Sequence, residues 1–113
     1  MSPEARDRAY LWDMLDAAKL IQDFMQNMTF NDYKSDRKLQ LAVERLLEIM
    51  GEAARRVSDG FKEAHQEIPW AKIIGQRNVL AHEYGEIRVE MLWVLIKENL
   101  GELITQIRSF GIE

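Results

Sequence analysis

The sequence predicts an all-α fold, an antiparallel bundle of four to five helices, from three observations. Apolar residues recur at steps of three and four along four long segments, which is the period of the α-helix. No segment of adequate length alternates apolar and polar residues with the period of two that is typical of a strand. The connections between the long segments are short, which favours antiparallel packing of neighbouring helices.

The first long segment is expected to form a helix that begins at the N-terminus. Ser2 can cap this helix, with Pro3 at its first helical position. Its apolar positions continue as far as Met28. The following residues, 29–35, hold Asn31-Asp32 and break the pattern, so a loop is expected there.

A second long helix is expected after this break. Ser35 or Asp36 can cap it, and its apolar face extends to Val57. The turn residues Ser58-Asp59-Gly60 end it. Residues 61–68 are ambiguous and favour a short helical turn followed by a loop.

Two further helices are expected in the second half of the chain. Pro69 starts the first of them, which runs through Ala81. Gly85 then interrupts the helical pattern. The last helix is expected from about Ile87 to Phe110. Residues 1–113 therefore form a single domain, a size that suits one hydrophobic core.

Composition narrows the function classes. The chain has no cysteine, which excludes disulfides, thiolate metal sites and a cysteine nucleophile. No apolar run approaches the ~18 residues of a membrane span, and the N-terminus has no signal-peptide core, so we expect a cytoplasmic protein without membrane contact. With 15 Lys+Arg against 19 Asp+Glu, the net charge of -4 argues against a general nucleic-acid binder.

The residues richest in chemistry lie between Gly75 and Gly85. Arg77 and His82 are five positions apart, so on a continuous helix they point ~140° away from each other. Asn78, four residues before His82, shares its face. Arg77 and His82 can meet on one ligand only if the helix unwinds before His82 or if a second copy of the chain supplies the missing partner. The length of the arginine side chain closes part of the gap.

These groups suit the chemistry of a phosphodiester. An imidazole exchanges protons near neutral pH, and a guanidinium binds phosphate oxygens with two hydrogen bonds. RNA supplies its own nucleophile, the 2′-hydroxyl, so such a site needs no metal. Tyr84 can stack on a base, donate a hydrogen bond to phosphate or accept a covalent modification. The structural alternative is that His82 caps a helix end and Arg77 pairs with a carboxylate.

Three charged residues of the second helix are further candidates for supporting the site. Glu48, which shares a face with Glu52, can orient an arginine across a cleft or belong to a solvated face. Arg55 and Arg56 can extend a phosphate-binding rim or act only as favourable charges at a helix C-terminus.

The string Arg77-Asn78-Val79-Leu80-Ala81-His82-Glu83-Tyr84 resembles the RX4HXY signature of the HepT-like branch of the HEPN superfamily. Residues 42–53 resemble the second-helix block of that family, and residues 68–75 resemble the approach to its motif. The similarity extends from about Asp13 to Leu103. It implies a HEPN-like helical bundle that forms a homodimer, with the two motifs facing a shared cleft.

The resemblance also implies a function. Relatives are metal-independent RNases that act as toxins and need no cofactor, each paired with a minimal nucleotidyltransferase antitoxin of the MntA type. Carried over by position, Arg77 binds phosphate, His82 is the catalytic histidine, and Tyr84 is the residue that the antitoxin AMPylates. Asn78 matches a polar residue common after the arginine. The alternative is a non-catalytic dimer that binds a nucleotidyltransferase partner and RNA or nucleotide.

Overall fold

The chain folds into helices alone in the residues that the computed structural model describes, which are 4–82 and 85–113, with only the backbone described at Arg77, Ala81 and His82. No strand occurs in these ranges, which confirms the predicted all-α class. The elements in chain order are α1 (Ala5–Met25), α2 (Phe30–Lys34), α3 (Arg37–Arg56), α4 (Asp59–Ala64), α5 (Trp70–His82) and α6 (Gly85–Arg108).

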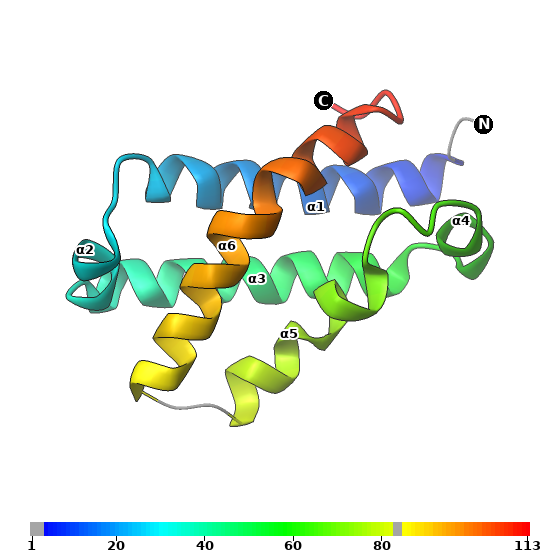
Figure 1. Ribbon diagram of the computed structural model, residues 1–113. Helices are drawn as coiled ribbons and strands as arrows, with labels where there is room; N and C mark the ends of the chain where they lie inside the picture. Colours follow the sequence, from blue (N-terminus) through cyan, green and yellow to red (C-terminus); the bar gives the residue numbers. More distant parts are fainter. Residues whose placement is uncertain (1–3, 83–84) are drawn as a thin grey trace.

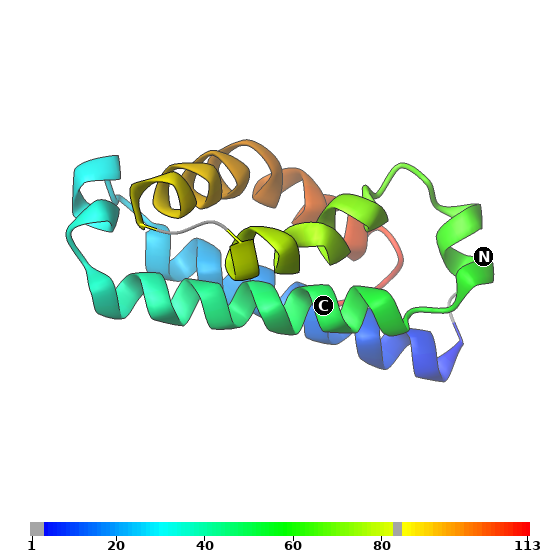
Figure 2. The same cartoon turned by 90° about the horizontal axis from the view of Figure 1, so that it is seen from below.

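The four long helices form two layers. In both views α1 and α3 lie side by side and antiparallel, as predicted (Figures 1 and 2). The second layer consists of α5 and α6, which form a V and cross the first layer obliquely (Figure 1). The core lies between the layers and includes the fully buried side chains of Leu11, Met14, Leu47, Met50, Leu92 and Ile107.

The first helix is shorter than its apolar pattern predicts. Glu4 has extended dihedrals, φ -67 and ψ 159, so the helix begins at Ala5; the expected cap Ser2 and start Pro3 lie outside the described residues. At its other end it stops at Met25 instead of Met28, because Asn27 adopts a left-handed conformation with φ 62. Asparagine is one of the few residues that tolerate this conformation.

The predicted loop at residues 29–35 is instead a short helix, α2. Thr29 Oγ1 accepts a hydrogen bond from Asp32 N at 3.1 Å, and the Asp32 carboxylate accepts one from Thr29 N at 3.0 Å, forming a capping box. At the other end, Gln40 Nε2 donates to the carbonyl oxygens of Tyr33 and Lys34, at 2.9 Å each. Side chains therefore cap both ends of this five-residue helix.

The remaining helix boundaries agree with the sequence to within a few residues. Asp36, one of the two expected caps, accepts a hydrogen bond from Leu39 N at 3.0 Å and starts α3. The short helical turn expected within residues 61–68 is α4. Gly85 marks the start of α6 with φ +60, and that helix ends at Arg108, two residues earlier than expected.

One buried carboxylate joins the start of α1 to the turn between α3 and α4. Asp7 of α1 is 6% exposed, and its two oxygens accept hydrogen bonds from Ser58 N at 2.9 Å and Ser58 Oγ at 2.7 Å. The Ser58 hydroxyl in turn caps α4 by accepting from Phe61 N at 3.3 Å. Asp7 therefore holds the turn at Ser58 in place. From the sequence, this turn was expected only as the end of the second long helix.

We expect Asp7→Ala to lower the free energy of unfolding by about 1–3 kcal/mol, because it leaves the Ser58 amide without its acceptor. Chemical denaturation of the purified protein measures this loss. Asp13→Ala, an exposed carboxylate on the same helix, is the matched control and should change stability by less than about 0.5 kcal/mol. Equal stability of the two variants would contradict the role assigned to Asp7.

Candidate active site

The helix that carries the Arg77–His82 segment is continuous. α5 runs without interruption from Trp70 to His82, so the expected alternative in which the helix unwinds before His82 is wrong. Positions 77 and 82 consequently differ by ~140° around the helix axis. A second chain, or the reach of the arginine side chain, remains as the way to bring the two groups together. Tyr84 and the side chains of Arg77 and His82 lie outside the described part of the structure.

A glycine determines how closely α5 packs against α3. A Cβ atom placed on Gly51 would lie 3.2 Å from the carbonyl oxygen of Ile73 and 3.9 Å from that of Ile74. Any larger residue at this position would push the two helices apart. The side chains of Trp70 and Ile73 are buried, so α5 packs into the core through the face that carries them. Asn78, further along α5, is exposed.

A nearly buried ion pair connects the elements on both sides of residues 83–84. Arg88 in the first turns of α6 donates from Nη1 to Glu44 Oε1 of α3 at 3.3 Å, and from Nη2 to the Leu80 carbonyl of α5. The side chains of Arg88 and Glu44 are only 17% and 12% exposed. This pair therefore anchors the end of the motif helix to α3. Sequence reasoning missed it, because the two residues are 44 positions apart and neither belongs to a local motif.

Glu48 lies on α3, the helix that packs against the motif helix α5. α3 and α5 run in opposite directions and touch at Gly51 with Ile73, while Arg88 links Glu44 to Leu80 (Figure 1). Glu48 lies between these two contact points along α3 and lines a shallow groove with Tyr10 and Asp13 of α1. It is exposed and accepts a hydrogen bond from Arg45 at 3.1 Å.

Arg55 and Arg56 lie past the Gly51 contact, away from the C-terminal end of α5. Both are held by Glu52, which accepts from Arg55 Nη2 at 2.8 Å and from Arg56 Nε at 2.9 Å. These hydrogen bonds lower the pKa of Glu52 to about 2 and raise the pKa of both guanidinium groups. The cluster lies toward the N-terminal end of α5, whereas positions 77 and 82 lie in its C-terminal half.

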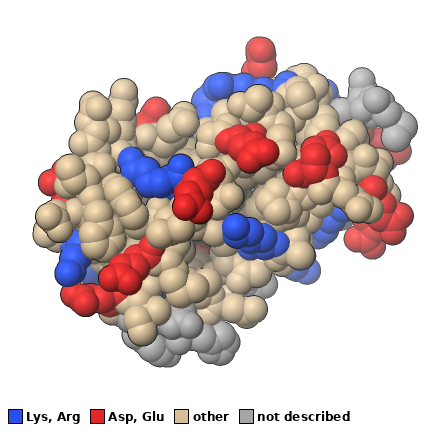
Figure 3. Space-filling model, in the orientation of Figure 1, with Lys and Arg blue, Asp and Glu red and all other residues tan. Residues whose placement is uncertain are grey.

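Charge is mixed on the surface around these helices. On the face shown in Figure 3, acidic and basic side chains alternate and are separated by uncharged areas, with no broad basic patch. The part of the chain that the structure describes holds no group of three His, Asp or Glu residues that could bind a metal ion. Among the same residues, no helix is long and apolar enough to cross a membrane.

The two-layer helical fold places the chain among small all-α proteins, and in its sequence Arg77, His82 and Tyr84 fall in the C-terminal half of α5 or just after its end. The family described as "Ribonuclease HepT-like" matches residues 14–110, which include all three of these residues. The chain belongs to the HepT-like ribonuclease family of the HEPN superfamily.

Individual relatives are similar over most of their length. A probable ribonuclease HepT of Thermococcus cleftensis is 40% identical over 94 residues, which cover 83% of this chain and 86% of the relative. A putative RNase of Methanocaldococcus jannaschii is 33% identical over 85% of this chain and 88% of its own. A putative RNase of Caldanaerobacter subterraneus is 33% identical, with coverages of 90% and 91%. No solved structure matches the chain.

Proposed function

We propose that the protein is a metal-independent RNA endonuclease that acts as the toxin of a toxin–antitoxin pair in the cytoplasm. The observation that carries the proposal is the string Arg77–His82–Tyr84 inside a family match that covers residues 14–110. Relatives over most of the chain are named as probable or putative RNases.

The proposed reaction is attack of the RNA 2′-hydroxyl on the adjacent phosphorus. His82 accepts the hydroxyl proton, the 2′-oxygen forms a bond to phosphorus, and the bond from phosphorus to the 5′-oxygen breaks. The leaving 5′-oxygen takes up a proton from water or from a protonated His82 imidazole, and the Arg77 guanidinium stabilises the charge on the phosphorane. The products carry a 2′,3′-cyclic phosphate, or a 3′-phosphate after hydrolysis, and a 5′-hydroxyl.

The continuous α5 helix supports a site that is shared between two chains. Because positions 77 and 82 diverge by ~140°, a symmetric dimer can pair Arg77 of one copy with His82 of the other. The face of α6 opposite the core also supports a dimer. Ile87, Met91 and Val94 are 58%, 43% and 49% exposed and follow helical spacing, so they form an unpartnered apolar stripe in the single chain.

We expect Met91→Lys to convert the dimer into a monomer, because it places a charge in the centre of this apolar stripe. Sedimentation velocity at several protein concentrations measures the change. Trp12→Lys, which charges an equally exposed apolar residue of α1 (49%), is the matched control and should remain dimeric. A monomeric wild-type protein, or a Met91→Lys variant that dimerises as the wild type does, would contradict the proposed interface.

The proposal assigns Tyr84 as the residue that a minimal nucleotidyltransferase antitoxin modifies. Incubation of the toxin with its cognate nucleotidyltransferase antitoxin and ATP is expected to add the mass of AMP to the wild type and none to Tyr84→Phe, because phenylalanine lacks the acceptor oxygen. Mass spectrometry of the intact proteins checks this. Tyr10→Phe is the control and should be modified like the wild type, and equal modification of Tyr84→Phe would refute the assignment.

The second candidate function is a non-catalytic dimer that docks a nucleotidyltransferase and holds RNA or nucleotide. The net charge of -4 and the mixed surface in Figure 3 favour it, since weak counterion release limits RNA affinity. Incubation of purified protein with RNA in EDTA separates the two functions. Cleavage, together with growth inhibition on expression, supports the toxin. Binding without cleavage supports the docking module.

A further inference from the structure

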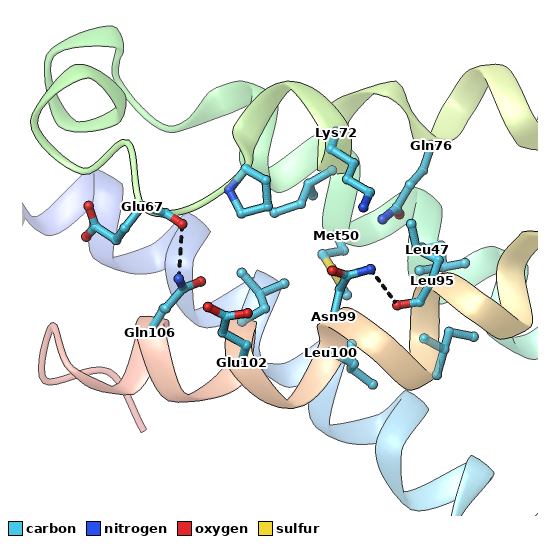
Figure 4. A pocket seen from close by; sticks show the side chains of 14 residues that line it. Leu47, Met50, Glu67, Lys72, Gln76, Leu95, Asn99, Leu100, Glu102 and Gln106 are labelled. Carbon is cyan, nitrogen blue, oxygen red and sulfur yellow. Dashed lines mark hydrogen bonds between the residues drawn. The ribbon is translucent and has the colours of Figure 1, made fainter.

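A pocket of about 160 Å³ lies between α5 and α6, next to the segment that carries Arg77 (Figure 4). Its apolar floor and walls come from three helices and include Leu47, Met50, Ile73 and Leu95. This volume is well below the ~300–1,000 Å³ of sites for drug-sized ligands. The pocket therefore suits one compact group, such as a single ring system, and not a whole nucleotide.

The polar groups of this pocket are side-chain amides, the ammonium group of Lys72 and the carboxylates of Glu67 and Glu102. Gln76 and Lys72 extend from α5 into the pocket, and Asn99 extends from α6 on the opposite wall (Figure 4). Asn99 Nδ2 donates to the Leu95 carbonyl at 3.2 Å, a bond that does not use its amide oxygen. Gln106 at one end of the pocket donates from Nε2 to the Glu67 carbonyl at 3.0 Å.

Gln76 has the feature that points to a ligand. The residue is only 6% exposed, and its buried Oε1 accepts no hydrogen bond from any described residue. A buried acceptor without a partner is destabilising, so native proteins seldom keep one unless another molecule satisfies it. An apolar group in the pocket would leave this oxygen unpaired, whereas a planar ligand with polar edges would satisfy it.

We propose that this pocket binds a single nucleobase, with the Gln76 amide hydrogen-bonded to the edge of the base. A base has two apolar faces, which match the aliphatic walls, and a rim of donors and acceptors, which match an amide able to do both. Proteins that accept an unstacked base commonly hold it between apolar side chains and read its edge in this way. Lys72 on the α5 wall supplies a positive charge for the attached phosphate, which would lie away from the Glu102 carboxylate on the facing α6 wall.

This inference deepens the proposed RNase function and rests on it for the source of the base. Gln76 directly precedes Arg77 on α5 and its side chain leaves the helix ~100° away, so a base in the pocket and the phosphate that Arg77 binds would belong to neighbouring nucleotides of one strand. The pocket would then select which nucleotide lies beside the cleaved bond. A free nucleotide offers the same chemistry, and the experiment has to distinguish these two sources.

The test uses the full-length protein, the four nucleoside 5′-monophosphates as probes, and Gln76→Met, which keeps the volume but removes the amide. Titrations followed by NMR should show saturable binding that differs among the four bases, weakened about 10-fold or more in Gln76→Met. Gln22→Met, an exposed glutamine of α1, should bind like the wild type. The melting temperature of Gln76→Met should stay the same or rise, since its Oε1 has no partner in the described chain.

Cleavage of a randomised RNA pool distinguishes the source of the base. A base preference at the cleaved step that Gln76→Met removes indicates the RNA substrate, while loss of mononucleotide binding with an unchanged preference indicates a free nucleotide. Mononucleotide binding without any RNA cleavage would support the pocket assignment and overturn the proposed RNase function. The pocket assignment is overturned if the wild type binds no mononucleotide at millimolar concentration, or if Gln76→Met binds them equally well.

Discussion

His82→Ala is expected to lower RNA cleavage by about 10²–10⁴-fold in the presence of EDTA, since it removes the group that accepts the 2′-hydroxyl proton. Arg77→Ala should cause a loss of similar order, because a preorganised charge on the phosphorane is worth about 10²–10³ in rate. Arg77→Lys should recover only part of this activity, since an ammonium group cannot form the two parallel hydrogen bonds of a guanidinium. Gel-based cleavage of a labelled RNA under single-turnover conditions measures all three.

The controls replace the same residue types elsewhere in the fold. His65→Ala removes the only other imidazole and should keep cleavage, although its loss of packing against Phe61 and Phe110 lowers stability. Arg108→Ala, at the far end of α6, should behave like the wild type. Cleavage by His82→Ala at the wild-type rate, or a strict requirement for Mg²⁺, would rule out the proposed mechanism.

Gly51→Leu is expected to cause the second large effect, a loss of both stability and activity. A side chain at this position would collide with the backbone of α5, because even a Cβ lies 3.2 Å from the Ile73 carbonyl oxygen. Overpacking of this kind costs about 1–3 kcal/mol of stability. The helix that carries Arg77 and His82 has to move away from α3, and a displacement of ~1 Å at an active site can lower the rate by ~10²-fold.

Gly101→Leu is the matched control for this substitution. Gly101 lies within α6, and no atom of the described chain is within 4 Å of a Cβ built there. The change should raise stability by about 0.8 kcal/mol, since leucine favours the helix more than glycine does. Thermal melts and RNA cleavage of both variants check the pair. A Gly51→Leu variant as stable and active as Gly101→Leu would contradict the role of Gly51 in placing α5.

The sequence predicted the long helices well because helical periodicity is a local signal. Their ends depended on features that the apolar pattern does not contain, such as the left-handed Asn27 that ends α1. The helix α2 was missed although its capping box, Thr29 with Asp32, is readable as a local motif. Its other cap comes from Gln40, and no local pattern reveals such a side chain.

The site was predictable only where its residues are close in sequence. The resemblance predicted the family, which the match over residues 14–110 confirms, whereas the roles of Arg77, His82 and Tyr84 stay predictions. It gave no indication of the Arg88–Glu44 pair or of the pocket at Gln76, because these depend on how α3, α5 and α6 pack. Arg55 and Arg56 were grouped with the site by charge, whereas the fold places them with Glu52 at the far end of α3.

The central claim is that one active site takes Arg77 from one chain and His82 from the other. Co-expression of Arg77→Ala and His82→Ala chains, each with its own tag, tests it directly. If the chains pair at random, half of the dimers hold one variant of each kind. Each of these mixed dimers has one intact site and one doubly defective site. About one quarter of wild-type cleavage should therefore return. Cleavage no higher than that of the two variants measured separately would contradict the shared site.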